Sequence, residues 1–168
     1  MSISLWLTFV AASAVLLIIP GPTILTVISY SISHGRRANL ALVAGVALGD
    51  STALFCSLVG LGALLAASAL AFTVVKWVGG LYLIYLGIRL FRSGVSLPEP
   101  TAAAATPESL WKLFGNTYLV TALNPKGMVF FAAFLPQFLN HDAPLAPQLW
   151  TLAITFVVLA TLNATLYA

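Results

Sequence analysis

Apolar residues fall into five long runs that are separated by short polar segments. The runs cover residues 5–32, 40–67, 72–91, 114–138 and 148–168. A helix needs about 20 predominantly apolar residues to cross the hydrocarbon core of a bilayer, and each run meets that length. The pattern therefore predicts an all-α fold, a polytopic bundle of transmembrane helices in which five spans are visible.

The first and fourth runs are interrupted by proline, which removes a backbone donor and clashes with the preceding turn, so both helices should be broken. Broken backbone persists at membrane depth only where it is buried in protein or lines a polar cavity. Interrupted spans at matching places in two halves of a chain indicate the binding site of a secondary transporter. The residues at the two breaks are Pro20, Gly21 and Pro22 in the first run and Asn124, Pro125 and Lys126 in the fourth.

Each interrupted run opens one half of the chain. We predict a single transmembrane domain, 1–168, built of repeat one (1–91), a proline-containing connector (92–113) that forms a flexible loop, and repeat two (114–168). Three spans per half is an odd number, so the second copy should be inverted, which gives a 3+3 inverted repeat. Repeat two shows two spans. Either the sequence is a truncated form of a six-helix protein, or the protein is a natural five-span form.

Composition supports a membrane location. Hydrophobic residues make up 61% of the 168 residues and charged residues only 7%, whereas a soluble domain carries roughly 25% charged residues. The net charge of +3 comes from scattered Lys and Arg residues, not from the basic stripe of a nucleic-acid-binding protein. We predict a multi-pass protein of a lipid bilayer with no nucleic-acid partner.

The distribution of Lys and Arg predicts the orientation in the membrane. Five of these residues lie in or beside loops 33–39 and 92–113, and only Lys76 lies near the opposite ends of the spans. Basic residues concentrate in cytoplasmic loops. We therefore expect both loops in the cytoplasm and the N-terminus outside.

Asp50 lies about ten residues into the second run, which at about 1.5 Å per residue places it near the middle of the hydrocarbon. An ionised carboxylate there costs about 2.5–3.5 kcal/mol on insertion scales. Such a residue usually faces a water-filled cavity or a partner. A carboxyl group whose protonation depends on its surroundings can couple proton movement to substrate movement. The alternative is a structural Asp that is hydrogen-bonded to a neighbouring helix.

The fourth run adds two polar side chains at its break. Lys126 could pair with Asp50 or with a substrate carboxylate, and the alternative is that it extends toward the lipid headgroups. Asn124 could bind substrate or satisfy a carbonyl freed by Pro125. The broken backbone of residues 20–22 would expose N–H groups that suit a carboxylate and carbonyls that suit an ammonium or another cation.

Small residues mark helix faces that can approach other helices closely in lipid. Gly45 and Gly49 form such a pair in the second run, and Gly79, Gly80 and Gly87 give the third run a similar surface. We interpret these glycines as packing positions.

Motifs of enzymes are missing from the sequence. It contains no nucleophile elbow, no H-E-x-x-H pair and no Walker loop. We predict that the protein is not an enzyme, needs no cofactor and uses an ion gradient for any transport.

Several motifs together resemble a known family. The first half carries Pro20-Gly21-Pro22, Gly35-Arg36-Arg37 and Gly45-x-x-x-Gly49-Asp50, followed by the glycine- and tyrosine-containing run 79–87. The second half carries Asn124-Pro125-Lys126, then Phe130-Phe131 and the segment 134–138. In this order, and over nearly the whole chain, these residues resemble the lysine exporter / homoserine-threonine resistance (LysE/RhtB) family.

The resemblance implies a bacterial inner-membrane exporter of amino acids and related small metabolites, energised by protons. It also implies a six-helix fold and homo-oligomers. The residues that would line the substrate and proton path are those at the two breaks together with Asp50.

Our hypothesis from the sequence is a secondary transporter that exports an amino acid by proton antiport. One alternative is a channel in which the same breaks line a permanent pore. Another is a non-transporting membrane scaffold that presents its long connector to a partner.

Overall fold

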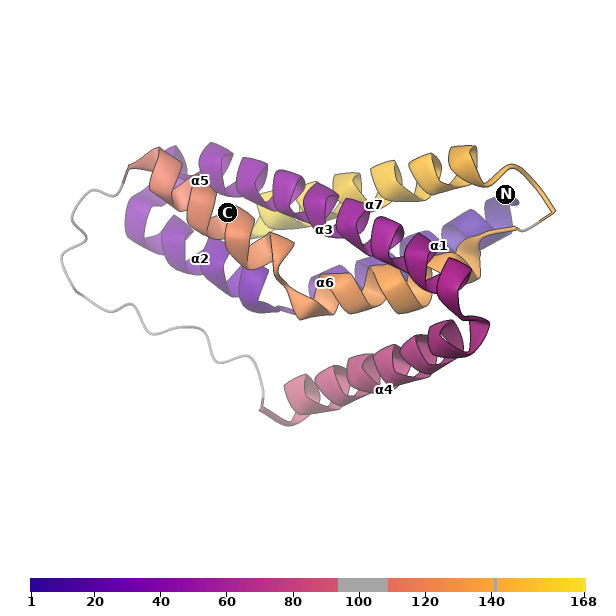
Figure 1. Ribbon diagram of the computed structural model, residues 1–168. Helices are drawn as coiled ribbons and strands as arrows, with labels where there is room; N and C mark the ends of the chain where they lie inside the picture. Colours follow the sequence, from indigo (N-terminus) through magenta and orange to yellow (C-terminus); the bar gives the residue numbers. More distant parts are fainter. Residues whose placement is uncertain (94–108, 141) are drawn as a thin grey trace.

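The computed structural model describes residues 1–93, 109–140 and 142–168, and the described chain is all-helical, as predicted (Figure 1). Most of the connector 92–113 lies outside the described residues. The α-helices are α1 (Ile3–Ile18), α2 (Pro22–His34), α3 (Asn39–Ala67), α4 (Ala69–Ser93), α5 (Leu110–Ala122), α6 (Pro125–Val129) and α7 (Leu145–Tyr167). Three short helical segments complete the described elements: the 3-10 helix η1 (Gly35–Arg37), the π-helix η2 (Phe130–Phe134) and the 3-10 helix η3 (Leu135–Phe138).

Four segments of the described chain are long and apolar enough to cross a membrane, and α1 with α2 makes a fifth if the bent pair is one span. The four are Asn39–Gly60, Leu70–Ile88, Leu110–Phe138 and Leu145–Tyr167. This confirms the polytopic bundle. The inverted relation between the two repeats stays a prediction.

The first break separates α1 from α2 and bends the pair by 54°. Ile19 ends α1 in an extended conformation, with φ −66° and ψ 112°. Gly21 is also extended, as expected for a residue before proline, and Pro22 occupies the first turn of α2, where its missing N–H costs no hydrogen bond. The prolines therefore break this helix as the sequence predicts.

The second break separates α5 from α6 and is built in the same way. Asn124 is extended, and Pro125 begins α6. The Asn124 side chain accepts a hydrogen bond from the Lys126 backbone N–H at 3.1 Å, which caps the new helix locally. Despite this break, Leu110–Phe138 remains one apolar segment of membrane-spanning length.

Two glycines of α3 let α5 pack closely against it. A Cβ atom on Gly49 would lie 2.6 Å from the Thr121 Cβ, and one on Gly45 would lie 2.9 Å from the Phe114 carbonyl oxygen. The predicted packing role of both residues is confirmed. Because Asp50 follows Gly49, the same close approach fixes its position relative to α5.

The glycines of α4 differ from one another. A Cβ atom on Gly79 would lie 2.7 Å from the Ala133 Cβ, so this glycine packs against η2 as expected. Nothing lies within 4 Å of a Cβ built on Gly80 or Gly87, so the packing prediction is not met there within the described chain. Figure 1 shows α4 at the edge of the bundle, and large apolar side chains such as Trp77 are exposed on it.

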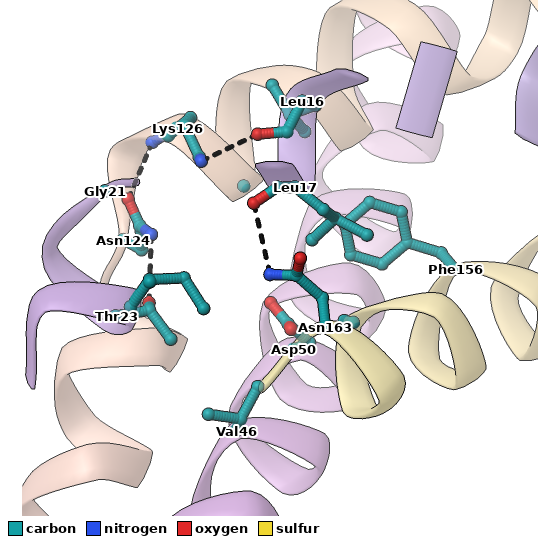
Figure 2. Close-up of a pocket in the computed structure, with 13 residues that line it drawn as sticks. Leu16, Leu17, Gly21, Thr23, Val46, Asp50, Asn124, Lys126, Phe156 and Asn163 are labelled. Atoms are coloured by element: carbon teal, nitrogen blue, oxygen red, sulfur yellow. Dashed lines mark hydrogen bonds between the residues drawn. The ribbon is translucent and has the colours of Figure 1, made fainter. Parts of the chain in front are cut away.

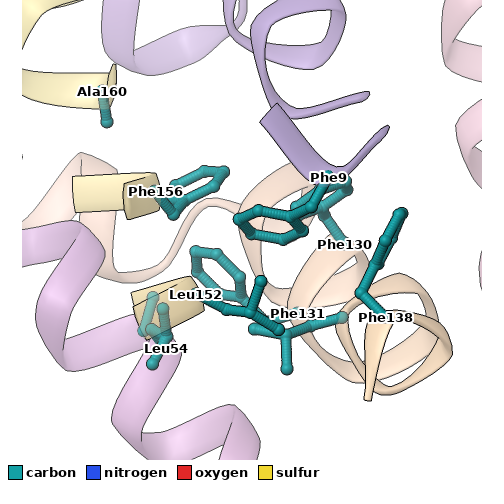
Figure 3. Close-up of a cluster of buried hydrophobic side chains, with 10 residues drawn as sticks. Phe9, Leu54, Phe130, Phe131, Phe138, Leu152, Phe156 and Ala160 are labelled. Carbon is teal, nitrogen blue, oxygen red and sulfur yellow. The ribbon is translucent and has the colours of Figure 1, made fainter. Parts of the chain in front are cut away.

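Among the described residues, the buried core consists of two apolar clusters. One is aromatic, with Phe131 and Phe156 edge to face at a centroid distance of 4.7 Å, and it includes Ala53 of α3 (Figure 3). The other contains Val46 of α3 together with residues of α2, α5 and α7. Since Asp50 lies between Val46 and Ala53 on α3, the buried carboxyl group occupies a layer between the two clusters.

Candidate functional site

A small cavity lies where the two breaks meet, and residues of α1, α2, α3, α6 and α7 line it (Figure 2). Its volume is about 30 Å³, which accommodates water but not an amino acid. Of the residues predicted from the sequence, Gly21, Asp50, Asn124 and Lys126 line this cavity. Pro20, Pro22 and Pro125 are not among the lining residues and act through the backbone that they break.

Asp50 is buried in the cavity wall with 8% of its surface exposed. Its side chain has no hydrogen-bond partner or ion pair among the described residues. A Cβ atom on Gly127 would lie 4.0 Å from its Oδ1, so α6 passes close to the carboxyl group. The hydrogen bond to a neighbouring helix that a structural Asp would make is therefore not seen in the described chain, and the carboxyl group faces the cavity.

Lys126 extends from α6 to the end of α1. Its Nζ donates hydrogen bonds to the Leu16 carbonyl at 2.9 Å and to the Ile19 carbonyl at 2.8 Å. The ammonium thus compensates the negative end of a helix. It does not extend toward headgroups, and it makes no ion-pair contact with Asp50 within the described chain, although the two charges attract each other.

Two further side chains cap the same helix end. Asn163 of α7 donates from Nδ2 to the Leu17 carbonyl at 3.1 Å, and the Tyr167 hydroxyl donates to the Ile18 carbonyl at 3.4 Å. The last carbonyls of a helix have no partner within it. Here the carbonyls of residues 16–19 are all satisfied by side chains from α6 and α7.

Sequence reasoning missed Asn163 and Tyr167. The available signal was an amide inside the apolar run 148–168, because a polar side chain at that depth needs a hydrogen-bond partner. Nothing in the neighbouring sequence indicates that this partner is a carbonyl of α1, which lies 146 residues away.

Asn124 joins the two breaks. While its oxygen caps α6, its Nδ2 donates to the Thr23 hydroxyl oxygen at 3.1 Å, so the start of α6 is tied to the start of α2. The interpretation that Asn124 satisfies a carbonyl freed by Pro125 is wrong, because its hydrogen bonds go to a backbone N–H and a hydroxyl group.

The start of α2 presents positive character to the cavity. Gly21 provides no side-chain cap, Pro22 has no N–H, and Thr23 and Ile24 of the first turn line the cavity. First-turn N–H groups lack partners within the helix and attract anions. The break thus brings the carbonyl end of α1 and the N–H end of α2 to one cavity, whose mostly apolar wall also contains Asp50.

These features define an all-helical membrane protein whose broken helices meet at a cavity with a few buried polar side chains in its wall, a construction typical of secondary transporters. The sequence profile of the LysE type translocator family matches residues 5–168. The chain belongs to that family, as its motifs predict.

The relatives agree with this assignment. A homoserine/homoserine lactone efflux protein of Salmonella typhimurium is 34% identical over 168 residues, which are 100% of this chain and 81% of the relative. An uncharacterized membrane protein of Vibrio cholerae is 34% identical over 159 residues, which are 95% of this chain and 77% of the relative. No solved structure matches the chain significantly.

Proposed function

We propose that this protein is a secondary carrier of the bacterial inner membrane that exports amino acids or closely related small metabolites by proton antiport. The observation that carries the proposal is the cavity between the two breaks, where opposite helix ends and a buried carboxyl group without a fixed partner meet. The similarity to homoserine/homoserine lactone efflux proteins supports a small polar substrate.

The helix ends suit the two charges of a zwitterion. The substrate carboxylate binds the N–H groups at the start of α2, where Thr23 and Ile24 line the cavity. Asp50 exchanges a proton as the cavity changes the side to which it opens. Because its side chain has no hydrogen-bond partner in the described chain, it can accept or release a proton without breaking an existing network.

The small size of the cavity favours a carrier over a channel. A permanent pore would be continuous and hydrated, whereas the space between the breaks is about 30 Å³. In the proposed carrier, this conformation is a closed one. In this proposal the Arg-containing turn Gly35–Arg37 faces the cytoplasm, because basic residues concentrate in cytoplasmic loops. Substrate enters from that side after α1 and α2 move relative to α6.

The test is transport by the purified protein. Proteoliposomes are loaded with a mixture of amino acids that includes homoserine, a proton gradient is imposed, and mass spectrometry identifies what leaves. The proposal expects saturable, gradient-dependent movement of one chemical class. Single-channel currents would instead establish a pore, and absence of any movement by folded, oriented protein would contradict the transport function.

A further inference from the structure

The carbonyl end of α1 has the form of a cation site. The carbonyls of Leu16 and Ile19 converge on one nitrogen atom, at 2.9 and 2.8 Å. Helix C-termini carry negative partial charge, and in transporters with interrupted helices such ends coordinate cations. The group that fills this site is the primary ammonium of Lys126.

An amino acid carries the same chemical group. Its α-ammonium has the three N–H donors and the single positive charge of the Lys126 ammonium. Lys126 therefore occupies, from within the chain, a site that is equally complementary to the ammonium of a transported molecule.

The approach of Lys126 to this site passes over Gly21. A Cβ atom on Gly21 would lie 3.3 Å from the Lys126 Nζ and 3.4 Å from its Cε. The absence of a side chain at Gly21 thus leaves room for the end of the flexible lysine stem beside the first break.

A second partner for the lysine lies in the same cavity. Asp50 is buried, with 8% of its surface exposed, lines the cavity and has no hydrogen bond or ion pair in the described chain. A buried carboxylate without a direct ion pair is costly, and an ammonium that moves into contact with it would reduce that cost.

We propose that the carbonyl end of α1 is a binding site for a primary ammonium group. Lys126 fills this site when the carrier is empty, and the ammonium of the substrate fills it when the carrier is loaded. The displaced Lys126 then pairs with Asp50. The inference rests on the proposed export of amino compounds. In the loaded state the substrate bridges the two helix ends, and Lys126 and Asp50 neutralise each other. Lys126 is thus a competitor of the substrate rather than its ligand.

The site can be tested without transport. In Lys126→Met the aliphatic stem remains but the ammonium is lost, so the carbonyls become available to a small probe. Methylammonium chloride should raise the Tm of Lys126→Met by about 3–5 °C when its concentration is roughly tenfold above its Kd. Tetramethylammonium, which has the charge but no N–H, should have no effect. The wild type should respond to methylammonium less than Lys126→Met does, because the probe must first displace Lys126, and Lys76→Met, altered on α4 outside the cavity, should behave like the wild type.

A binding measurement then distinguishes a competitor from a ligand. If Lys126 competes with the substrate, Lys126→Met should bind homoserine more tightly, with a Kd roughly tenfold lower than that of the wild type. Weaker binding by Lys126→Met would mean that Lys126 contacts the substrate, and it would overturn the displacement.

A failure of the cation site is distinguishable from a failure of the proposed function. Equal responses of Lys126→Met to methylammonium and tetramethylammonium overturn the site even if the wild type transports homoserine. If Lys126→Met does not fold, Lys126→Gln replaces it, because its amide keeps a donor for one carbonyl. The same preference for methylammonium, with a smaller shift in Tm, is expected there, and no preference would overturn the site.

Discussion

The two helix breaks of this protein are similar in sequence but are stabilised differently. The break at Asn124 is capped locally, by a hydrogen bond between Asn124 and the N–H of Lys126 two residues later. The break after α1 has no such local cap. Its carbonyls depend on Lys126, Asn163 and Tyr167, which are 107 to 149 residues away.

This difference separates the roles of the two breaks. The first supplies backbone groups, namely the carbonyl end of α1 and the N–H end of α2. The second supplies the side chains of Asn124 and Lys126, which hold those groups in place. A break whose caps come from distant side chains can open when those side chains move away, whereas a local cap stays with its own helix. We infer that the first break is the one that changes during transport.

Among the uncharged capping residues, Asn124 should contribute most to the free energy of unfolding. Replacing it by Ala removes both the local cap of α6 and the hydrogen bond to Thr23. The expected loss of unfolding free energy is about 2 kcal/mol. Equilibrium unfolding in mixed micelles measures it. Thr23→Val removes only the connection between the breaks and should cost about half as much. A Thr23→Val protein as unstable as Asn124→Ala would show that the local cap contributes nothing.

Replacing Asn163 by Leu should have a smaller effect, since it leaves one carbonyl of α1 without its partner. The expected cost is about 1 kcal/mol, typical of a hydrogen bond between membrane helices. Thr165→Leu, an exposed change on the same helix whose hydroxyl bonds only within α7, is the control. Faster hydrogen exchange at the first break in Asn163→Leu, and not in the control, would support the stabilisation of this break by distant side chains. Equal exchange in both variants would contradict it.

Tyr167→Phe should have the smallest effect. Its hydroxyl lies 3.4 Å from the Ile18 carbonyl, which is long for such a bond. We expect a loss of less than about 0.5 kcal/mol in the same unfolding measurement. A loss as large as that of Asn163→Leu would mean that the end of α7 holds the first break more tightly than the distance indicates.

Local signals explain what the sequence could predict. Proline at residues 20, 22 and 125 defines both breaks from nearest neighbours alone, and charge within an apolar run identifies Asp50 and Lys126. The partners of these groups depend on tertiary packing. The ammonium of Lys126, on its long, flexible stem, could reach Asp50 or the end of α1. Only the arrangement of the helices selects the carbonyls of Leu16 and Ile19.

The glycines show the same limit. Gly49 of α3 and Gly79 of α4 contact other helices closely, whereas no described residue lies within 4 Å of a Cβ atom built on Gly80 or Gly87 of α4. Small residues indicate that close packing is permitted, but the spacing alone does not say which of them is in contact.

The most direct test of a proton-coupled site between the breaks is gradient-driven homoserine efflux by Asp50→Asn in proteoliposomes. Asp142→Asn, an equal change at an exposed loop residue, is the matched control. We predict that Asp50→Asn reconstitutes as folded protein but loses gradient-driven efflux, while Asp142→Asn keeps it. Gradient-driven efflux by Asp50→Asn at the rate of the control would contradict the role of Asp50 in proton coupling.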